Sequence, residues 1–123
     1  MRIVIADDER DTLMTLGVLL RSEGFEVFLA QNGEHAARIV REVEPHAVLL
    51  DLGMPGRSGY AIANELTREY GGRCPILVAV TAHTREPQRR LAALSGIRHH
   101  VTKPYDPDAL LKLLVSLKPA SAR

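Results

Sequence analysis

Five polar residues that could do chemistry follow short apolar runs of this 123-residue chain. They are two adjacent acids, a third acid, a hydroxyl and an ammonium: Asp7, Asp8, Asp51, Thr81 and Lys103. If the runs are parallel strands of one sheet, their carboxyl ends share an edge, and open α/β sheets bind ligands at that edge. The side chains would then meet in one crevice, which suits a divalent metal and a phosphoryl group.

The acidic part of this set predicts a magnesium site. Mg²⁺ prefers oxygen ligands in octahedral geometry and keeps several waters, so two or three carboxylates with some solvent suit it. Adjacent side chains at a strand end point in different directions, so Asp7 and Asp8 would supply one direct and one water-mediated contact. Asp51 would approach from the neighbouring strand. The three acids exceed Lys103 by two negative charges, which one divalent cation balances.

The same crevice could perform acyl phosphate chemistry, in which an Asp carboxylate attacks phosphorus and carries the phosphoryl group covalently. Asp51 is the predicted nucleophile, because it lies at the centre of the expected sheet and precedes the Gly- and Pro-containing loop 52–56. Thr81 and Lys103 would bind phosphoryl oxygens. Positioning and electrostatics carry most of the catalysis in such reactions.

Strands that alternate with helices are expected to position these residues. The apolar runs predict strands at about 2–6 and 25–29, one that ends at Asp51, one at 76–81 and one that starts near Gly96. Apolar residues at helical spacing, with caps and glycine stops, predict helices at about 10–22, 34–42, 84–94 and 107–117. A further helix is predicted between a cap at Ser58 and a stop at Gly71-Gly72. Such alternation favours a parallel sheet, because right-handed crossovers need the intervening helices.

Two details concern the last strand and its exit. Alternation along the strand predicts one exposed and one half-buried position for His99 and His100. Tyr105, two residues after Lys103, is expected to be a surface residue.

Length, charge and cysteine content limit the number of domains, the partners and the location that we expect. The chain fits one domain, for which we expect residues 1–117, with 118–123 as a C-terminal tail or a linker stub. Lys plus Arg number 16 against 15 Asp plus Glu, and this net charge of +1 predicts no direct binding to nucleic acid or membrane. Without a signal peptide or an apolar run of bilayer length, we expect a soluble, cytoplasmic protein. The lone Cys74 excludes an internal disulfide.

Four motifs carry a resemblance to a known family: Asp7-Asp8, Asp51-Leu52-Gly53-Met54-Pro55 with Gly59, Thr81-Ala82, and Lys103-Pro104. In their order and spacing the chain resembles, from Ile3 to Leu114, the CheY-like receiver domain of bacterial response regulators in two-component signalling. The resemblance implies an α/β fold, the flavodoxin-like (βα)5 doubly wound sandwich, with a five-stranded parallel sheet in order 2-1-3-4-5.

The resemblance also implies roles for these residues. Asp51 would accept a phosphoryl group from a sensor histidine kinase or a phosphotransfer protein, which makes the chain a phosphorylation switch and not an enzyme. Asp8, Asp51 and the backbone carbonyl of Gly53 would ligate Mg²⁺, the one cofactor implied, with Asp7 acting mainly through water.

A switch is implied as well. Thr81 would move toward the phosphoryl group, Lys103 would pair with it, and the Lys103-Pro104 bond would be cis. His100 stands three positions before the lysine, where the family usually has the Tyr or Phe that rotates. These changes would remodel the face made by the fourth helix, fifth strand and fifth helix as a population shift between two packings. A downstream protein target, and also a homodimer, could bind that face.

Alternatives stay open. The chain could be a single-domain regulator, or the receiver of a hybrid histidine kinase or of a multidomain response regulator. A different class is the aspartyl-phosphate phosphatase of the haloacid dehalogenase type, which commonly carries a second Asp two residues after the nucleophile, where Gly53 stands here. A flavodoxin-like cofactor binder would need a phosphate-cradling loop after the first strand, where Asp7-Asp8-Glu9 would repel phosphate.

Overall fold

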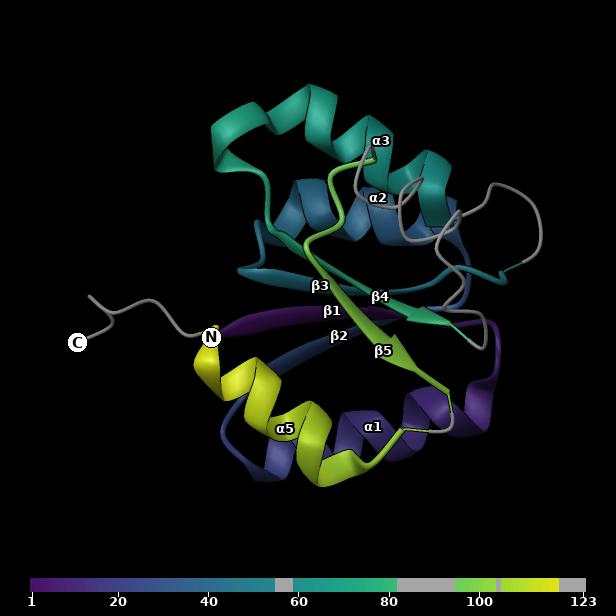
Figure 1. Ribbon diagram of the computed structural model, residues 1–123, viewed down its shortest axis with the longest axis vertical. Coiled ribbons are helices and arrows are strands. Elements are labelled where there is room, and N and C mark those ends of the chain that lie inside the picture. The colour runs from purple at the N-terminus through teal and green to yellow at the C-terminus, as the bar shows by residue number, and fades with distance from the viewer. Residues whose placement is uncertain (55–58, 82–94, 104, 118–123) are drawn as a thin grey trace.

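In a computed structural model of the protein, a five-stranded parallel sheet lies between two layers of helices (Figure 1). The structure describes residues 1–54, 59–81, 95–103 and 105–117. The strands are β1 (Arg2–Ala6), β2 (Glu26–Ala30), β3 (Ala47–Asp51), β4 (Ile76–Thr81) and β5 (His99–Thr102). The helices are α1 (Arg10–Ser22), α2 (Gly33–Val43), α3 (Gly59–Tyr70), α5 (Pro107–Ser116) and the short 3-10 helix η1 (Gly71–Arg73).

The sheet has the order β2-β1-β3-β4-β5, and each neighbouring pair is parallel. The predicted α/β fold class and strand order are therefore confirmed. Figure 1 shows α2 and α3 over one face of the sheet and α1 and α5 over the other. The expected helix at 84–94 and the predicted helix start at Ser58 lie outside the described residues.

Two hydrophobic cores result from this layering. Successive side chains of a strand point to opposite faces, so Ile3 and Ile5 pack toward α1 and α5 while Val4 and Ala6 pack toward α2 and α3. All five residues of β3 are buried, as expected for a central strand covered by helices on both faces. Asp51 is therefore delivered by the most buried strand of the sheet.

Local capping fixes where the helices begin and end. The side chain of Asn32 accepts a 2.8 Å hydrogen bond from the His35 N–H at the start of α2. Asp106 accepts a 3.1 Å bond from the Asp108 N–H, ahead of the first-turn proline of α5. Gly24 follows α1 with a φ of 89°, which glycine adopts without strain. None of the helices in the described ranges is both long and apolar enough to cross a bilayer.

The predicted second strand is one residue early. Phe25 was expected to begin it, but the Phe25 N–H donates a 3.1 Å hydrogen bond to the Leu20 carbonyl at the end of α1. The residue therefore belongs to the turn after α1, and β2 runs from Glu26 to Ala30.

The expectations for the last strand also need correction. The strand was expected to start near Gly96, but the φ of Gly96 is 90°, which lies outside the extended region. β5 begins three residues later, at His99. His99 and His100 are both half-buried, so the prediction of one exposed position is wrong. An edge strand of a sheet with helices on both faces has no fully solvated side.

Candidate functional site

The carboxyl ends of four strands meet at one edge of the sheet. Asp7 and Asp8 follow β1, Asp51 ends β3, Thr81 ends β4, and Lys103 follows β5. The strand register brings the ends of neighbouring strands to nearly the same height along the sheet. The pairs that show this are Ala6 with Leu50, Asp51 with Val80, and Thr81 with Thr102. The predicted meeting of the five residues at one sheet edge is thus what the topology produces.

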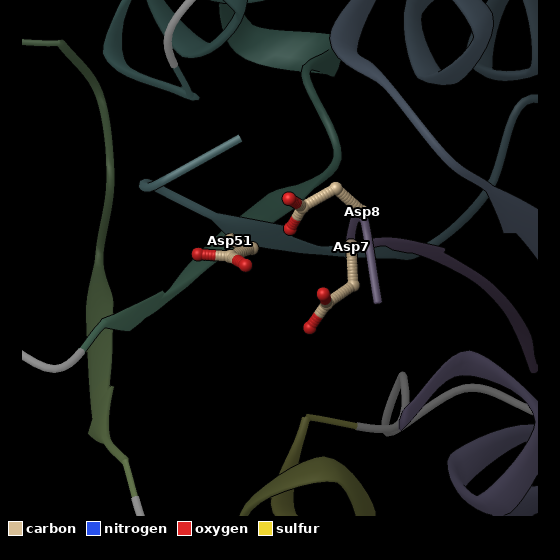
Figure 2. Close-up of side chains that lie close together, drawn as sticks. All are labelled: Asp7, Asp8 and Asp51. Carbon is tan, nitrogen blue, oxygen red and sulfur yellow. The ribbon is translucent and has the colours of Figure 1, made fainter. Parts of the chain in front are cut away.

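Three carboxylates gather at this edge. One oxygen from each of Asp7, Asp8 and Asp51 lies within 4.8 Å of the others. Figure 2 shows that the carboxylates of Asp7 and Asp8 leave the end of β1 in different directions, with Asp51 facing them from β3. Asp7 and Asp51 are buried and Asp8 is exposed. This all-oxygen donor set, open to water on one side, could hold a hard divalent cation.

Backbone hydrogen bonds orient two of the acids. Asp7 Oδ1 accepts a 2.8 Å bond from the Glu9 N–H, and Asp51 Oδ1 accepts a 2.8 Å bond from the Gly53 N–H. The Leu52 N–H in turn donates to the Val80 carbonyl at 3.1 Å, which extends the pairing of β3 with β4 past Asp51. Each carboxylate is fixed through one oxygen and keeps the other for a partner.

Lys103 lies between the two buried acids. Its Nζ is 3.1 Å from Asp51 Oδ2 and 3.4 Å from Asp7 Oδ2. Partial burial lowers the pKa of Lys103, but the hydrogen bond that its ammonium donates to Asp51 and the negative charges of Asp51 and Asp7 outweigh this effect, so that the pKa is raised overall. The ammonium therefore keeps its charge at neutral pH.

The surroundings of Asp7 disfavour its ionised form. Burial raises its pKa above 3.8, and the negative charge of Asp51 adds to the rise. The Glu9 N–H and the Lys103 ammonium oppose this shift without cancelling it. A cation bound among the acids would relieve the same penalty.

Thr81 and His100 lie on the strands next to this cluster. Thr81 is buried at the end of β4, between the strands that carry Asp51 and Lys103. Its carbonyl accepts a 2.8 Å hydrogen bond from the Lys103 N–H. His100 is half-buried in β5, in register with Ala79. Pro104 lies outside the described residues, as does the predicted cis bond.

One residue near the site was placed wrongly by the sequence reasoning. Tyr105 was expected at the surface, but it is half-buried and packs against the core under α1 and α5. Burial raises the pKa of Tyr105, and the negative charge of Asp7 raises it further. The sequence signal for this burial was the position of Tyr105 two residues after Lys103. A chain that places Lys103 beside Asp7 must also pass close to the acids in the next few residues.

Three further residues named from the sequence, Gly53, Met54 and Cys74, differ in their burial. Gly53 is exposed, and its N–H donates a hydrogen bond to Asp51 Oδ1. This bond holds the peptide that follows Asp51 close to the carboxylate. Met54 is buried in the core under α2 and α3, which makes it a packing residue. Cys74 is a half-buried free thiol whose pKa burial raises, and it lies before β4, at the end of the sheet opposite the acids.

A doubly wound sheet with acids, threonine and lysine at its carboxyl edge defines a phosphoacceptor switch domain. The chain belongs to the response regulator receiver domain family, whose model matches residues 3–115. It is therefore a receiver domain of two-component signalling, as the sequence motifs indicated.

Individual relatives agree with this assignment. The chain is 31% identical over 113 residues to Protein PilH of Pseudomonas aeruginosa, covering 92% of this chain and 93% of PilH. A chain in the co-crystal structure of the Saccharomyces cerevisiae phosphotransfer protein Ypd1 and the receiver domain of Ssk1 is 28% identical, with a TM-score of 0.88 and coverage of 95% and 88%. The Vibrio cholerae chemotaxis protein CheY4 shares the fold, with 20% identity, a TM-score of 0.88 and coverage of 94% and 97%. These comparisons give no support to the haloacid dehalogenase alternative.

Proposed function

We propose that Asp51 accepts a phosphoryl group from the phosphohistidine of a sensor histidine kinase or a phosphotransfer protein. The observation that carries this proposal is the position of the Asp51 carboxylate beside the Lys103 ammonium and close to two further acids, Asp7 and Asp8. Its Oδ2 lies 3.1 Å from the Lys103 ammonium, and one of its oxygens lies within 4.8 Å of oxygens of Asp7 and Asp8. A nucleophile in this position attacks where positive charge can stabilise the transferring group.

The transfer itself exchanges one bond to phosphorus for another. A carboxylate oxygen of Asp51 forms a bond to phosphorus while the nitrogen–phosphorus bond of the donor breaks. The electron pair of that bond returns to the imidazole, which takes up a proton. Lys103 pairs with the phosphoryl oxygens, and the hydroxyl of Thr81 donates to them from the end of β4. The chain acts as a switch that is loaded and unloaded, and not as an enzyme with a released product.

Mg²⁺ is the metal that this donor set fits best. Asp8, Asp51 and the carbonyl of Gly53 would hold it directly, with Asp7 contributing through water. The exposure of Asp8 supports this assignment, because Mg²⁺ keeps several of its waters. When bound, the ion would supply charge stabilisation at the phosphoryl oxygens.

The signal would leave the site through β4 and β5. The 2.8 Å bond between the Lys103 N–H and the Thr81 carbonyl supports this route, since it ties the end of β4 to the exit of β5. Thr81, His100 and Pro104 are the proposed switch residues, and the output face includes β5 and α5. A downstream protein target, and a homodimer, would use this face. The fourth helix of the face, expected at 84–94, lies outside the described residues.

Two further assignments belong to this proposal. Residues 1–117 form the receiver domain, with 118–123 as a tail or linker stub. The phosphodonor is an intracellular signalling protein, and we propose the cytoplasm as the place of action.

The test is the intact mass of the protein after incubation with acetyl phosphate and Mg²⁺. We expect a gain of one phosphoryl group that EDTA prevents and that Asp51→Asn abolishes. Asp106→Asn, a change at an acid that caps α5, is the matched control and should be phosphorylated like the wild-type protein. Equal phosphorylation of Asp51→Asn and the wild-type protein would contradict the proposal.

A further inference from the structure

Gly59, the first residue of α3, lies unusually close to the backbone that carries Asp51. A Cβ atom added at Gly59 would lie 2.7 Å from Leu52 Cδ2 and 3.1 Å from both the Asp51 carbonyl oxygen and Leu52 Cα. Carbon atoms that are not bonded have their optimal separation at about 3.5–4.0 Å. With a side chain at position 59, the end of the Leu52 side chain would have to turn away, and the backbone of Asp51 and Leu52 would have to shift by a few tenths of an ångström.

Conformational freedom of glycine does not explain this position. The described glycines with positive φ are Gly24, Gly71 and Gly96, and Gly59 is not among them. What the structure requires at position 59 is the absence of a side chain and not an unusual backbone angle.

The helix cannot simply move away to accommodate a larger residue. Ile62, Ala63 and Leu66 of α3 are fully buried in the core that covers β3. Such interiors are close-packed, so a displacement of α3 would open gaps along this whole contact. The strand end at Asp51 and Leu52 is the part that would yield.

A shift of that strand end reaches the carboxylate directly. Leu52 is held to β4 by its 3.1 Å hydrogen bond to the Val80 carbonyl. The next residue, Gly53, orients Asp51 Oδ1 through its N–H at 2.8 Å. Displacing Leu52 therefore moves both the carboxylate and the peptide whose carbonyl is the proposed third metal ligand.

We propose that Gly59 is a positioning residue for the metal site, because its missing side chain lets α3 hold the backbone of Asp51 and Leu52 in place. This inference rests on the proposed Mg²⁺ site at Asp51. It assigns to the start of α3 a role in setting metal affinity, in addition to its role in the core.

The experiment compares Mg²⁺ affinities, measured by isothermal titration calorimetry, of the wild-type protein and Gly59→Ala. Loss of a group that orients metal ligands typically weakens metal binding about 10-fold to 100-fold, and we expect Gly59→Ala to fall in this range. Thermal unfolding in EDTA checks that the variant is folded. An affinity equal to that of the wild-type protein would overturn the inference.

The matched control is Gly96→Ala, which also makes α3 clash with a neighbouring segment. A Cβ at Gly96 would collide with the side chain of Thr67, and the φ of 90° adds strain. Thr67 lies eight residues along α3 from Gly59, about 12 Å along the helix axis. Gly96→Ala should destabilise the fold and keep the wild-type Mg²⁺ affinity. If it weakens Mg²⁺ binding as much as Gly59→Ala does, the effect is general destabilisation and the inference fails.

A second variant tests the steric route. Leu52→Ala removes the atom that a Cβ at position 59 would meet at 2.7 Å, so the double variant Leu52→Ala/Gly59→Ala should regain part of the lost affinity. A deficit that stays complete would overturn this route. If Gly59→Ala does not fold, the double variant is compared with Leu52→Ala. Its added Cβ still lies 3.1 Å from the Asp51 carbonyl oxygen and from Leu52 Cα, so it should bind Mg²⁺ more weakly than Leu52→Ala, and equal affinities overturn the inference. Failure of the wild-type protein itself to bind Mg²⁺ would overturn the proposed function, and the inference with it.

Discussion

The ammonium of Lys103 lies 3.1 Å from Oδ2 of Asp51, so the last strand of the sheet places a positive charge beside the acid that ends the central strand. The same ammonium lies 3.4 Å from Asp7. In the metal-free protein it offsets part of the repulsion among three acids. In the phosphorylated protein it would face the phosphoryl group.

Lys103→Met is therefore expected to slow phosphorylation more than it affects folding. Removal of one group that stabilises developing charge costs about 100-fold to 1,000-fold in rate, and we expect at least the lower value. The measurement is the initial rate of phosphorylation by acetyl phosphate, followed by intact mass. Lys112→Met, at an exposed lysine of α5, is the control and should react at the wild-type rate. A normal rate in Lys103→Met would remove the lysine from the mechanism.

Asp7→Asn should stabilise the metal-free protein at neutral pH. The folded-state pKa of Asp7 is raised above 3.8, so the folded state binds a proton more tightly than the unfolded chain does. Above that raised pKa the ionised carboxylate lowers the stability of the fold, and this penalty disappears as the pH falls toward 3.8. Asparagine carries no charge and keeps an oxygen that can accept the Glu9 N–H.

The melting temperature in EDTA checks this sign. Asp7→Asn should melt higher than the wild-type protein at pH 7, with a difference that closes in acid. Asp11→Asn, at an exposed acid in the first turn of α1, is the control. A lower melting temperature of Asp7→Asn at pH 7 would show that Asp7 stabilises the fold.

Mg²⁺ should raise the stability of the wild-type protein through binding to the folded state alone. At a free Mg²⁺ concentration ten times Kd, the gain in the free energy of unfolding is about 1.4 kcal/mol. Asp8→Asn, which removes the exposed proposed ligand, should lose most of this gain. Denaturant unfolding with Mg²⁺ and with EDTA measures it. The idea that Asp8 is a ligand is wrong if the variant gains as much stability as the wild-type protein.

His46 predicts a loss of stability below neutral pH that is unrelated to the metal site. It lies just before β3, where its Nδ1 accepts a 2.9 Å hydrogen bond from the Arg2 N–H and must be unprotonated to do so. Burial lowers the pKa of His46 below 6.5, and the charges of Arg2 and the amino terminus add to the effect. At a pH above 6.5 the group is neutral in both states and carries no penalty.

As the pH falls below 6.5 the unfolded chain takes up this proton first, so the folded state loses stability until the pH reaches the lowered pKa. His46→Asn keeps an acceptor near Arg2 and should remove this part of the pH dependence. Thermal unfolding between pH 7.5 and pH 5 measures the slope, with His35→Asn as the control. An unchanged slope in His46→Asn would assign the dependence to another group.

Residue patterns along the chain were sufficient to predict the sheet and its chemical edge. Apolar runs that each end in a polar residue fix which side chains leave the strands at the carboxyl end. Parallel pairing then brings Asp51, Thr81 and Lys103 together, whatever the details of the loops. The site was predictable because it depends on strand ends and not on side-chain packing.

The features that could not be predicted depend on close approach between segments distant in sequence. Predicting the contact of Gly59 with Leu52 would need the distance at which α3 packs on β3. Predicting the burial of Tyr105 would need the path of the chain after Lys103. On the surface, Arg41 of α2 binds Glu65 and Glu69 of α3 at 2.9 and 3.0 Å, a contact that depends on the relative position of two helices. Periodicity carries no information about such distances.

The most direct test of the account is to locate the phosphoryl group on the phosphorylated protein. Borohydride reduces an aspartyl phosphate to homoserine, and peptide mass spectrometry then identifies the modified position. We predict homoserine at position 51 alone, in a Mg²⁺-dependent yield that is sharply reduced in Lys103→Met. Modification at Asp7 or Asp8, with Asp51 intact, would contradict the assignment of Asp51 as the phosphoacceptor.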